Sequence, residues 1–400
     1  MKSPLDYAST GVNYDVLDQF KRNCQRAAAT TLDLLQGHGV TEPAGIRGES
    51  AYLVETPDEY LAHVEEGLGT KNLVADALLA LAQVVEPQTA SGGRKSPDAG
   101  ARQPAAANGA SQAPGCCPYF NIGIDTVAAI VNDLLTVGAL PMVVAMHAAV
   151  GSAKWFEHVD RARDLAEGFA EGCRQAGAVW GGGETPALKG LVNDDAIILA
   201  GSAMGRIRPK PLRIAGDVQV GDAIVLLASS GVHANGLTLC REVATRLPQG
   251  YLTPLADGRS YGESLLDASI IYSAFIRDCQ QANVPLHYAV HMTGHGWRKL
   301  MRLTGNWVYK LTDLGLVPPI FPFIQQAAGL DQREMYGTFN MGAGFAVYVR
   351  PNDAERCLQI AQQAGYTAWI GGHLAREEDR KAVVLEPLGI AFEGESLNIR

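Results

Sequence analysis

Basic residues are scarce in this 400-residue sequence: 33 Lys and Arg stand against 42 Asp and Glu, and the formal net charge at pH 7 is −9. Proteins that bind nucleic acids or anionic membrane surfaces need the opposite imbalance. The composition therefore argues against both kinds of partner. Such a chain would repel a polyphosphate ligand unless a divalent cation offset the charge.

Paired cysteines are lacking as well. The seven cysteines are odd in number and include no Cys-x-x-Cys pair, which fits a reducing cytoplasm better than a disulfide framework. The sequence shows no signal peptide and no long uncharged apolar run, so we expect neither secretion nor a membrane span. Together these absences predict a cytoplasmic protein.

Large apolar side chains are missing between Val85 and Tyr119. Residues 86–118 are instead rich in Ala, Gly, Pro, Ser and Gln, and they cannot bury enough surface to offset the entropy of ordering them. This composition predicts a disordered insertion, most of which should be dispensable. The adjacent Cys116 and Cys117 cannot easily ligate one ion together, so we assign no metal site to them.

The remainder has the composition of a soluble globular protein, with 47% hydrophobic and 19% charged residues. Apolar segments of strand length alternate with helical patterns in both halves, which is typical of an α/β or α+β fold. A chain of this length usually forms two domains. We predict an N-terminal domain over residues 1–212 and a C-terminal domain over residues 213–400. Strands are expected at 142–149, 178–180, 196–207, 222–228, 307–311, 344–349, 367–370 and 382–385, and helices at 16–35, 160–176, 237–246, 319–326 and 353–364.

The segment at 123–141 organises the chain, because its pattern is that of one helix with two different faces. Asp125 stands where an N-cap is expected and Gly138 where a C-terminal glycine is expected. One face is an apolar stripe of Val127, Ile130, Val131, Leu134 and Leu135. The other face carries small and polar residues, namely Asp125, Ala128, Ala129, Asn132 and, next round the helix, Asp133. Acids beside a bare alanine surface indicate a metal–phosphate site, and a solvated face with an N-cap is the alternative.

Two glycine-rich turns add acids to this half. Residues 66–71, Glu-Gly-Leu-Gly-Thr-Lys, combine two glycines with an acid, a threonine and a lysine, a set that can cradle a phosphate although its spacing is not that of a Walker A motif. Residues 181–186, Gly-Gly-Gly-Glu-Thr-Pro, would let the backbone approach a ligand and let Glu184 reach a metal. An ordinary strand-to-helix turn and a flexible turn with an exposed acid are the respective alternatives.

The C-terminal half contains two turns that each carry histidine. Residues 229–236, Ser-Ser-Gly-Val-His-Ala-Asn-Gly, lie between a predicted strand and a predicted helix, an arrangement in which helix amides bind anions. Residues 287–296 lead into a helical segment at 297–303 and repeat the arrangement. Singly, such histidines are more often structural, but two turns of this kind favour a shared site. The histidines concerned are His233, His287, His291 and His295.

These motifs occur together in one family. The chain resembles aminoimidazole ribonucleotide synthetase, also called phosphoribosylformylglycinamidine cyclo-ligase, over nearly its whole length apart from the insertion. The resemblance rests on Tyr7-Ala-Ser-Thr-Gly-Val12, Glu66–Lys71, the 123–141 helix, Gly182-Gly-Glu-Thr185, the two histidine turns and Met335–Gly344. The Thr338-Phe339-Asn340 core of the last segment is the most specific element. Thiamine-monophosphate kinase, selenophosphate synthetase and formylglycinamidine ribonucleotide amidotransferase share the wider fold and the acid motifs.

The resemblance implies a two-domain fold in which the N-terminal sheet pairs with its twin to form a dimeric barrel. An α/β domain follows, and an ATP site lies between the two. Acids at family positions for Mg²⁺ and nucleotide are Glu66, Asp125, Asp133 and Glu184. Residues in the nucleotide motifs are Gly67, Gly69, Thr70, Lys71, Asn132, Gly182 and Gly183. Residues that would face the substrate are His233, Asn235, His291 and Thr293, and the implied catalytic residues are His233, His291 and Lys71.

The implied reaction is the ATP-dependent conversion of formylglycinamidine ribonucleotide to aminoimidazole ribonucleotide. Phosphorylation of an amide oxygen would create a leaving group that a neighbouring nitrogen displaces as the ring closes, and His233 or His291 would move the proton. Alternatives are a sibling ATP-dependent enzyme of the same fold and a non-catalytic nucleotide-binding paralogue.

The chain departs from the family pattern at three places. Glu66 replaces an aspartate, and His295 replaces the middle glycine of a triple-glycine turn. The upstream Gly-Gly-Phe-Gly-type loop is missing, and Gly45-Ile-Arg-Gly48 stands near its place. These departures leave ATP binding as the expectation and make the identity of the substrate the open point.

Overall fold

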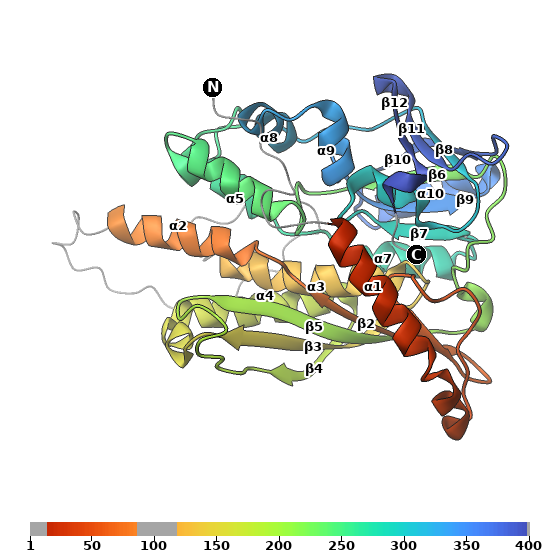
Figure 1. The fold of residues 1–400 in the computed structure, drawn as a ribbon, viewed down its shortest axis with the longest axis horizontal. Coiled ribbons are helices and arrows are strands. Elements are labelled where there is room, and N and C mark those ends of the chain that lie inside the picture. Colours follow the sequence, from red (N-terminus) through yellow and green to blue (C-terminus); the bar gives the residue numbers. More distant parts are fainter. Residues whose placement is uncertain (1–13, 86–117, 398–400) are drawn as a thin grey trace.

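The computed structural model describes residues 14–85 and 118–397, which form two sheet-containing domains (Figure 1). The predicted insertion at 86–118 lies almost entirely outside the described residues. The last strand of the first sheet ends at Ile207 and the first strand of the second begins at Ala223. The predicted boundary at 212/213 falls within this connection. The mixed α/β two-domain fold expected from the sequence is confirmed.

The N-terminal domain is a five-stranded sheet in the order β1-β2-β5-β3-β4. Only β3 and β4 run parallel, and the other neighbours are antiparallel. The strands are β1 Tyr52–Glu55, β2 Tyr60–Gly67, β3 Leu140–Val150, β4 Val179–Glu184 and β5 Ile197–Ile207. Burial alternates along β5, as expected for a sheet covered on one face. Helices α3 (Tyr119–Leu135) and α4 (Val159–Ala176) cover that face and separate the sheet from the second domain (Figure 1).

Helix α3 begins earlier than the sequence indicates. Asp125 is not its N-cap but lies more than a turn inside the helix, fully buried. The helix extends back because Tyr119 is buried and its ring meets the Trp155 ring edge-on, with centroids 5.2 Å apart. At the other end, Gly138 adopts φ +84° in the turn that stops the helix, as predicted. The apolar stripe of α3 is buried throughout, also as predicted.

Glycines allow α3 and α4 to approach closely. A Cβ on Gly168 would lie 1.9 Å from the Phe120 carbonyl oxygen, and one on Gly123 would lie 2.3 Å from the Phe169 nitrogen. Helix backbones come this near only where side chains are absent. The predicted helix at 160–176 is confirmed, with Gly177 in the left-handed conformation as its stop.

The C-terminal domain contains a seven-stranded sheet in the order β12-β11-β8-β10-β6-β9-β7. It is antiparallel except where β11 pairs with β8. Its strands are β6 Ala223–Ala228, β7 Tyr288–His291, β8 Val308–Leu311, β9 Ala343–Val349, β10 Ala368–Ala375, β11 Ala382–Leu385 and β12 Ile390–Glu393. Its helices are α5 Leu237–Arg246, α6 Tyr261–Leu265, α7 Ser273–Gln281, α8 Ile320–Ala328, α9 Gln332–Thr338 and α10 Pro351–Gln363. Sequence patterns predicted α5, α8 and α10 but missed α6, α7, α9 and β12.

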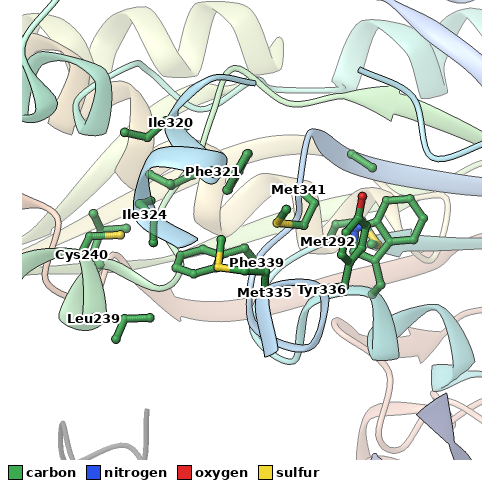
Figure 2. Packing of buried hydrophobic residues seen from close by; sticks show 14 of the residues in the cluster. Leu239, Cys240, Met292, Ile320, Phe321, Ile324, Met335, Tyr336, Phe339 and Met341 are labelled. Carbon is green, nitrogen blue, oxygen red and sulfur yellow. The ribbon is translucent and has the colours of Figure 1, made fainter. Parts of the chain in front are cut away.

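The Thr338-Phe339-Asn340 segment is a core element of this domain. Figure 2 shows Phe339 among apolar side chains of α8 and α9, and its ring centroid lies 5.8 Å from that of Phe321. Asn340 is buried, and its side chain bonds the Ser229 hydroxyl and donates to the Gly231 carbonyl. The most specific family motif thus holds the 229–236 turn in place through the hydrogen bonds of Asn340.

The N-terminal segment lies against the second domain. Helix α1 (Tyr14–Ala29) is followed by a 3₁₀ helix at Leu32–His38, so the single helix predicted at 16–35 is broken. Helix α2 (Asn72–Val85) follows the 66–71 turn. None of the helices in the described ranges combines the length and apolar character that a bilayer crossing requires.

Candidate active site

A pocket lies between the two domains, where three of the predicted turns meet the alanine face of α3. The N-terminal domain contributes Glu66, Gly67, Ala128, Ala129 and Asp133. The C-terminal domain contributes His233, Ala234, Asn235, Ser269, His291 and Thr293. The small face of α3 therefore leaves space beside its acids, as its pattern indicated.

Two strand–turn–helix units form opposite walls of this pocket. The 66–71 turn joins β2 to α2, and the 229–236 turn joins β6 to α5. The turns approach each other. A Cβ added at Gly69, where φ is +78°, would lie 3.8 Å from the Ala234 carbonyl oxygen, and the hydroxyls of Thr70 and Thr238 are 3.4 Å apart. A nucleotide phosphate between them would meet backbone amides at the starts of two helices.

The acidic side of the pocket is a contact between Glu66 and Asp133. Burial raises the pKa of Glu66 to about 7, and the charge of Asp133 adds to the effect. Burial also acts to raise the pKa of Asp133, but the hydrogen bond from His291 and the charge of Lys299 outweigh it and keep that pKa below its ordinary value. Asp133 is therefore the ionised partner, and Glu66, with a pKa of about 7, is partly protonated at neutral pH.

His291 is held by Asp133. Its Nδ1 lies 2.8 Å from the Asp133 Oδ1, and both side chains are buried. Burial lowers the pKa of His291, so the ring is neutral at pH 7, with its Nδ1 proton donated to the carboxylate. The Nε2 lone pair is then available to accept a proton, which makes His291 the better candidate for a general base.

His233 differs from His291 in that its Nε2 is already occupied as a hydrogen-bond acceptor. Its Nε2 accepts hydrogen bonds from the backbone amides of Ser230 at 3.1 Å and Ile270 at 3.5 Å. Burial lowers the pKa of His233 well below its ordinary value, with Lys71 and His291 contributing. The ring is therefore neutral with its proton on Nδ1, an atom that is buried without a hydrogen-bond partner among the described residues. His233 can donate a hydrogen bond but is a poor base.

Lys71 and Asp125 do not face the pocket but form a buried ion pair. Lys71 Nζ lies 2.8 Å from Asp125 Oδ2 and donates to the Asp267 carbonyl at 2.7 Å, and both side chains are fully buried. The Ser269 amide and hydroxyl donate to Asp125 Oδ1. Burial raises the pKa of Asp125, opposed by Lys71 and Ser269. The sequence placed both residues at the nucleotide, whereas here they join the two domains.

Two other predicted groups also lie away from the pocket. Asn132 is buried, donates to the Ile270 carbonyl and accepts from the Tyr272 amide, so its side chain ties α3 to the second domain. Gly182, Gly183 and Glu184 lie in β4, the exposed edge strand of the first sheet. Among residues 14–85 and 118–397, no three or more His, Cys, Asp or Glu side chains gather to hold a metal. The four predicted acids are therefore divided among three places.

His295 occupies a glycine conformation. Its φ is +73°, within the left-handed region that favours glycine, which accounts for the glycine that the family pattern has there. Its Nε2 lies 3.4 Å from Asp18 Oδ2, so α1 contacts the second histidine turn. His287 lies apart, with its Nδ1 2.6 Å from Asp222 Oδ2. His295 and His287 are thus structural, as single histidines usually are.

Sequence reasoning missed Lys299 and Ser269. Lys299 belongs to a 3₁₀ helix, η7 (Gly296–Arg302), is buried, and donates to the Thr293 hydroxyl. No motif of the sequence includes Lys299, so the sequence offered no signal for it. Ser269 lies in a segment without any motif, so nothing in the sequence pointed to it.

Comparisons with known proteins agree with this architecture. Family models described as AIR synthase related protein, N-terminal domain and C-terminal domain, match residues 104–207 and 219–384. The phosphoribosylformylglycinamidine cyclo-ligase of Pyrococcus furiosus is 31% identical over 393 residues, covering 97% of this chain and 99% of that protein. The enzyme of the same name from Carboxydothermus hydrogenoformans is 34% identical over 274 residues, covering 66% and 76%.

Solved structures are similar in fold alone. The HypE–HypF complex superposes with a TM-score of 0.53 at 15% identity, covering 86% of this chain and 92% of the other. AaThiL complexed with AMPPCP and TMP gives a TM-score of 0.52 at 10% identity, covering 88% and 92%. With both family models matched in order and a relative above 30% identity along nearly the whole chain, this protein belongs to the AIR synthase related family, as the phosphoribosylformylglycinamidine cyclo-ligases do.

Proposed function

We propose that this protein is an ATP-dependent cyclo-ligase that converts formylglycinamidine ribonucleotide to aminoimidazole ribonucleotide in purine biosynthesis. One observation of the site carries the proposal: a neutral histidine, His291, is held by Asp133 in a pocket that also receives two phosphate-binding turns. The names of the relatives from Pyrococcus furiosus and Carboxydothermus hydrogenoformans support the same reaction.

The chemistry requires activation of an amide oxygen, which is a poor leaving group at neutral pH. The γ-phosphoryl group of ATP is transferred to that oxygen, and ADP leaves. A neighbouring nitrogen then attacks the amide carbon, the carbon–oxygen bond breaks, inorganic phosphate departs, and the nitrogen loses a proton. Catalysis of such steps is mostly positioning and charge neutralisation.

The residues have distinct parts in this scheme. His291 Nε2 accepts the proton that the attacking nitrogen loses, and Asp133 holds the ring in the required tautomer. His233 lines the pocket beside it, and the Ser230 and Ile270 amides hold its ring in place. The backbone amides of the 66–71 turn would bind the ATP phosphates, with Gly67 of this turn and Asn235 of the 229–236 turn lining the pocket.

Mg²⁺ fits the pair of carboxylates in the pocket. This ion usually takes one or two protein carboxylates and completes its shell with phosphate oxygens and water. Glu66 and Asp133 line the pocket together and would supply that pair, and a bound cation would relieve the repulsion between their charges. When bound, Mg²⁺ neutralises phosphate charge in a chain whose net charge is −9.

The uncovered face of the N-terminal sheet is the basis for a homodimer. It exposes a set of apolar side chains: Val143, Val179, Ile198 and Met204. A second copy of this sheet would cover them and close a barrel. The described cysteines are all unpaired, in keeping with a cytoplasmic enzyme.

ADP release by the purified protein, measured with and without formylglycinamidine ribonucleotide, tests the proposal. We expect ADP to form only when the substrate is present, and in equal amount to aminoimidazole ribonucleotide. We also expect the gene to restore growth of a purine-requiring strain that lacks its own cyclo-ligase. ADP formation with another substrate would favour a sibling enzyme. ATP binding without turnover would favour a non-catalytic paralogue.

A further inference from the structure

Lys299 is a buried cation that the scheme above does not use. Its side chain is 8% exposed, and it extends from η7 toward the acidic side of the pocket without lining the pocket itself. Burial lowers its pKa to about 8, with Arg302 adding to this and Asp133 opposing it. The amine is therefore predominantly protonated at neutral pH.

The contact between Lys299 and Thr293 fixes the direction of a hydrogen bond. An ammonium group has three donors and no acceptor, so the Thr293 oxygen must accept from Lys299 Nζ. The Thr293 hydroxyl proton then points away from Lys299, and Thr293 lines the pocket. Lys299 thereby leaves Thr293 with a donor to offer to a ligand.

Both signs of charge meet at the pocket. Glu66 and Asp133 suit a cation, while Lys299, whose charge lowers the pKa of both carboxyls, donates to Thr293. A donor that is itself bonded by an ammonium suits an oxyanion. A metal-bound phosphate would match both charges at once.

We propose that Lys299 is a positioning residue that orients the Thr293 hydroxyl as a donor to a phosphate oxygen of the substrate. The inference rests on the proposed function for the identity of the phosphate compound. The direction of the Thr293 hydrogen bond does not depend on that function. The phosphate is that of ATP or that of the ribonucleotide, and separate titrations distinguish the two.

The test is a double-mutant cycle read by calorimetric titration with Mg-ATP, with formylglycinamidine ribonucleotide and with inorganic phosphate. Thr293→Val removes the hydroxyl without changing the shape, and we expect it to raise the dissociation constant of one of the two substrates about ten- to a hundredfold, the value of a hydrogen bond to a charged group. Lys299→Met should have a similar effect, and the double variant should bind no more weakly than the weaker single variant. Lys310→Met, which removes an ion pair with Glu377, is the matched control and should leave binding unchanged.

A purely structural role for Lys299 predicts a different pattern. Effects that multiply in the double variant, or Thr293→Val binding both substrates and phosphate like the original protein, would overturn the inference. If Lys299→Met does not fold, Thr293→Ser decides: it should bind as the original protein does, and a loss equal to that of Thr293→Val would count against the donor. Failure of ring closure in the unaltered protein, with the cycle intact, would refute the proposed function alone.

Discussion

Helix α3 carries two buried aspartates, two turns apart, with opposite surroundings. Asp125 is matched by Lys71 and by two hydrogen bonds from Ser269, so its charge is satisfied within the protein. Asp133 faces the second carboxyl of Glu66 and a neutral His291 beside the pocket, with the Lys299 ammonium as the cation that acts on both acids. The first arrangement is complete without a ligand, whereas the second gains from a cation. Two acids on one helix therefore have different functions because of what faces them.

Breaking the Asp125 pair should have the largest effect on stability. Asp125→Ala leaves the fully buried Lys71 ammonium unpaired, and we expect the free energy of unfolding to fall by about 3–5 kcal/mol in urea titration. The double variant with Lys71→Met should recover much of this loss, because no buried charge then remains. A change below about 1 kcal/mol would mean that water or a rearrangement compensates the lysine.

Asp133→Asn should act on the reaction rather than on the fold. The neutral asparagine can donate its amide to His291 Nδ1, which favours the tautomer with the proton on Nε2, and it no longer stabilises the protonated ring. We therefore expect kcat to fall about 10²-fold or more, the usual contribution of a positioned base. Repulsion with Glu66 disappears at the same time, and the free energy of unfolding should change by about 1 kcal/mol or less. Assays over a range of Mg²⁺ concentrations should also show a higher requirement for the ion. An unaltered kcat would place the base elsewhere.

Ser269→Ala tests the comparison further, because Ser269 lines the pocket but donates its hydrogen bonds to Asp125. Loss of its hydroxyl removes one hydrogen bond to a buried charge, and we expect about 1.5–3 kcal/mol of destabilisation in thermal or urea unfolding. The dependence of activity on Mg²⁺ should stay as it is. A large shift in that dependence would show that the Asp125 network reaches the metal.

Glu184→Gln should have the smallest effect. Its carboxylate is exposed on edge strand β4, outside the pocket of its own chain, so we expect the Mg-ATP dissociation constant to change less than about twofold. Calorimetry at several protein concentrations is the measurement. A loss of tenfold or more would indicate that a partner copy brings β4 to the site, and the acids would then act as the sequence suggested.

Sequence patterns predicted the elements well where the signal is local. The strands β3 and β5 and the helix α4 with its Gly177 stop followed from apolar periodicity and a left-handed glycine. The start of α3 was wrong because an aspartate in a helical pattern looks the same whether it caps the helix or lies buried within it. The difference depends on Lys71 and Ser269, which are distant in sequence.

The site was predictable in part for the same reason. Glu66, Asp133, His233 and His291 belong to motifs, and the structure brings them to one pocket. Lys71, Asn132 and Asp125 also belong to motifs, but their side chains are bonded within the protein. Lys71 and Asp125 pair with each other, and all three also bond groups of the second domain. Lys299 belongs to none of the predicted motifs, and only its contact with Thr293 reveals it.

The fate of the amide oxygen tests the central claim most directly. Formylglycinamidine ribonucleotide labelled with a heavy oxygen isotope at its formyl amide would be converted by the purified protein with Mg²⁺ and unlabelled ATP, and the released phosphate analysed by mass spectrometry. Activation of that oxygen by phosphoryl transfer predicts one labelled oxygen in each inorganic phosphate formed. Unlabelled phosphate, with the label in water, would contradict it.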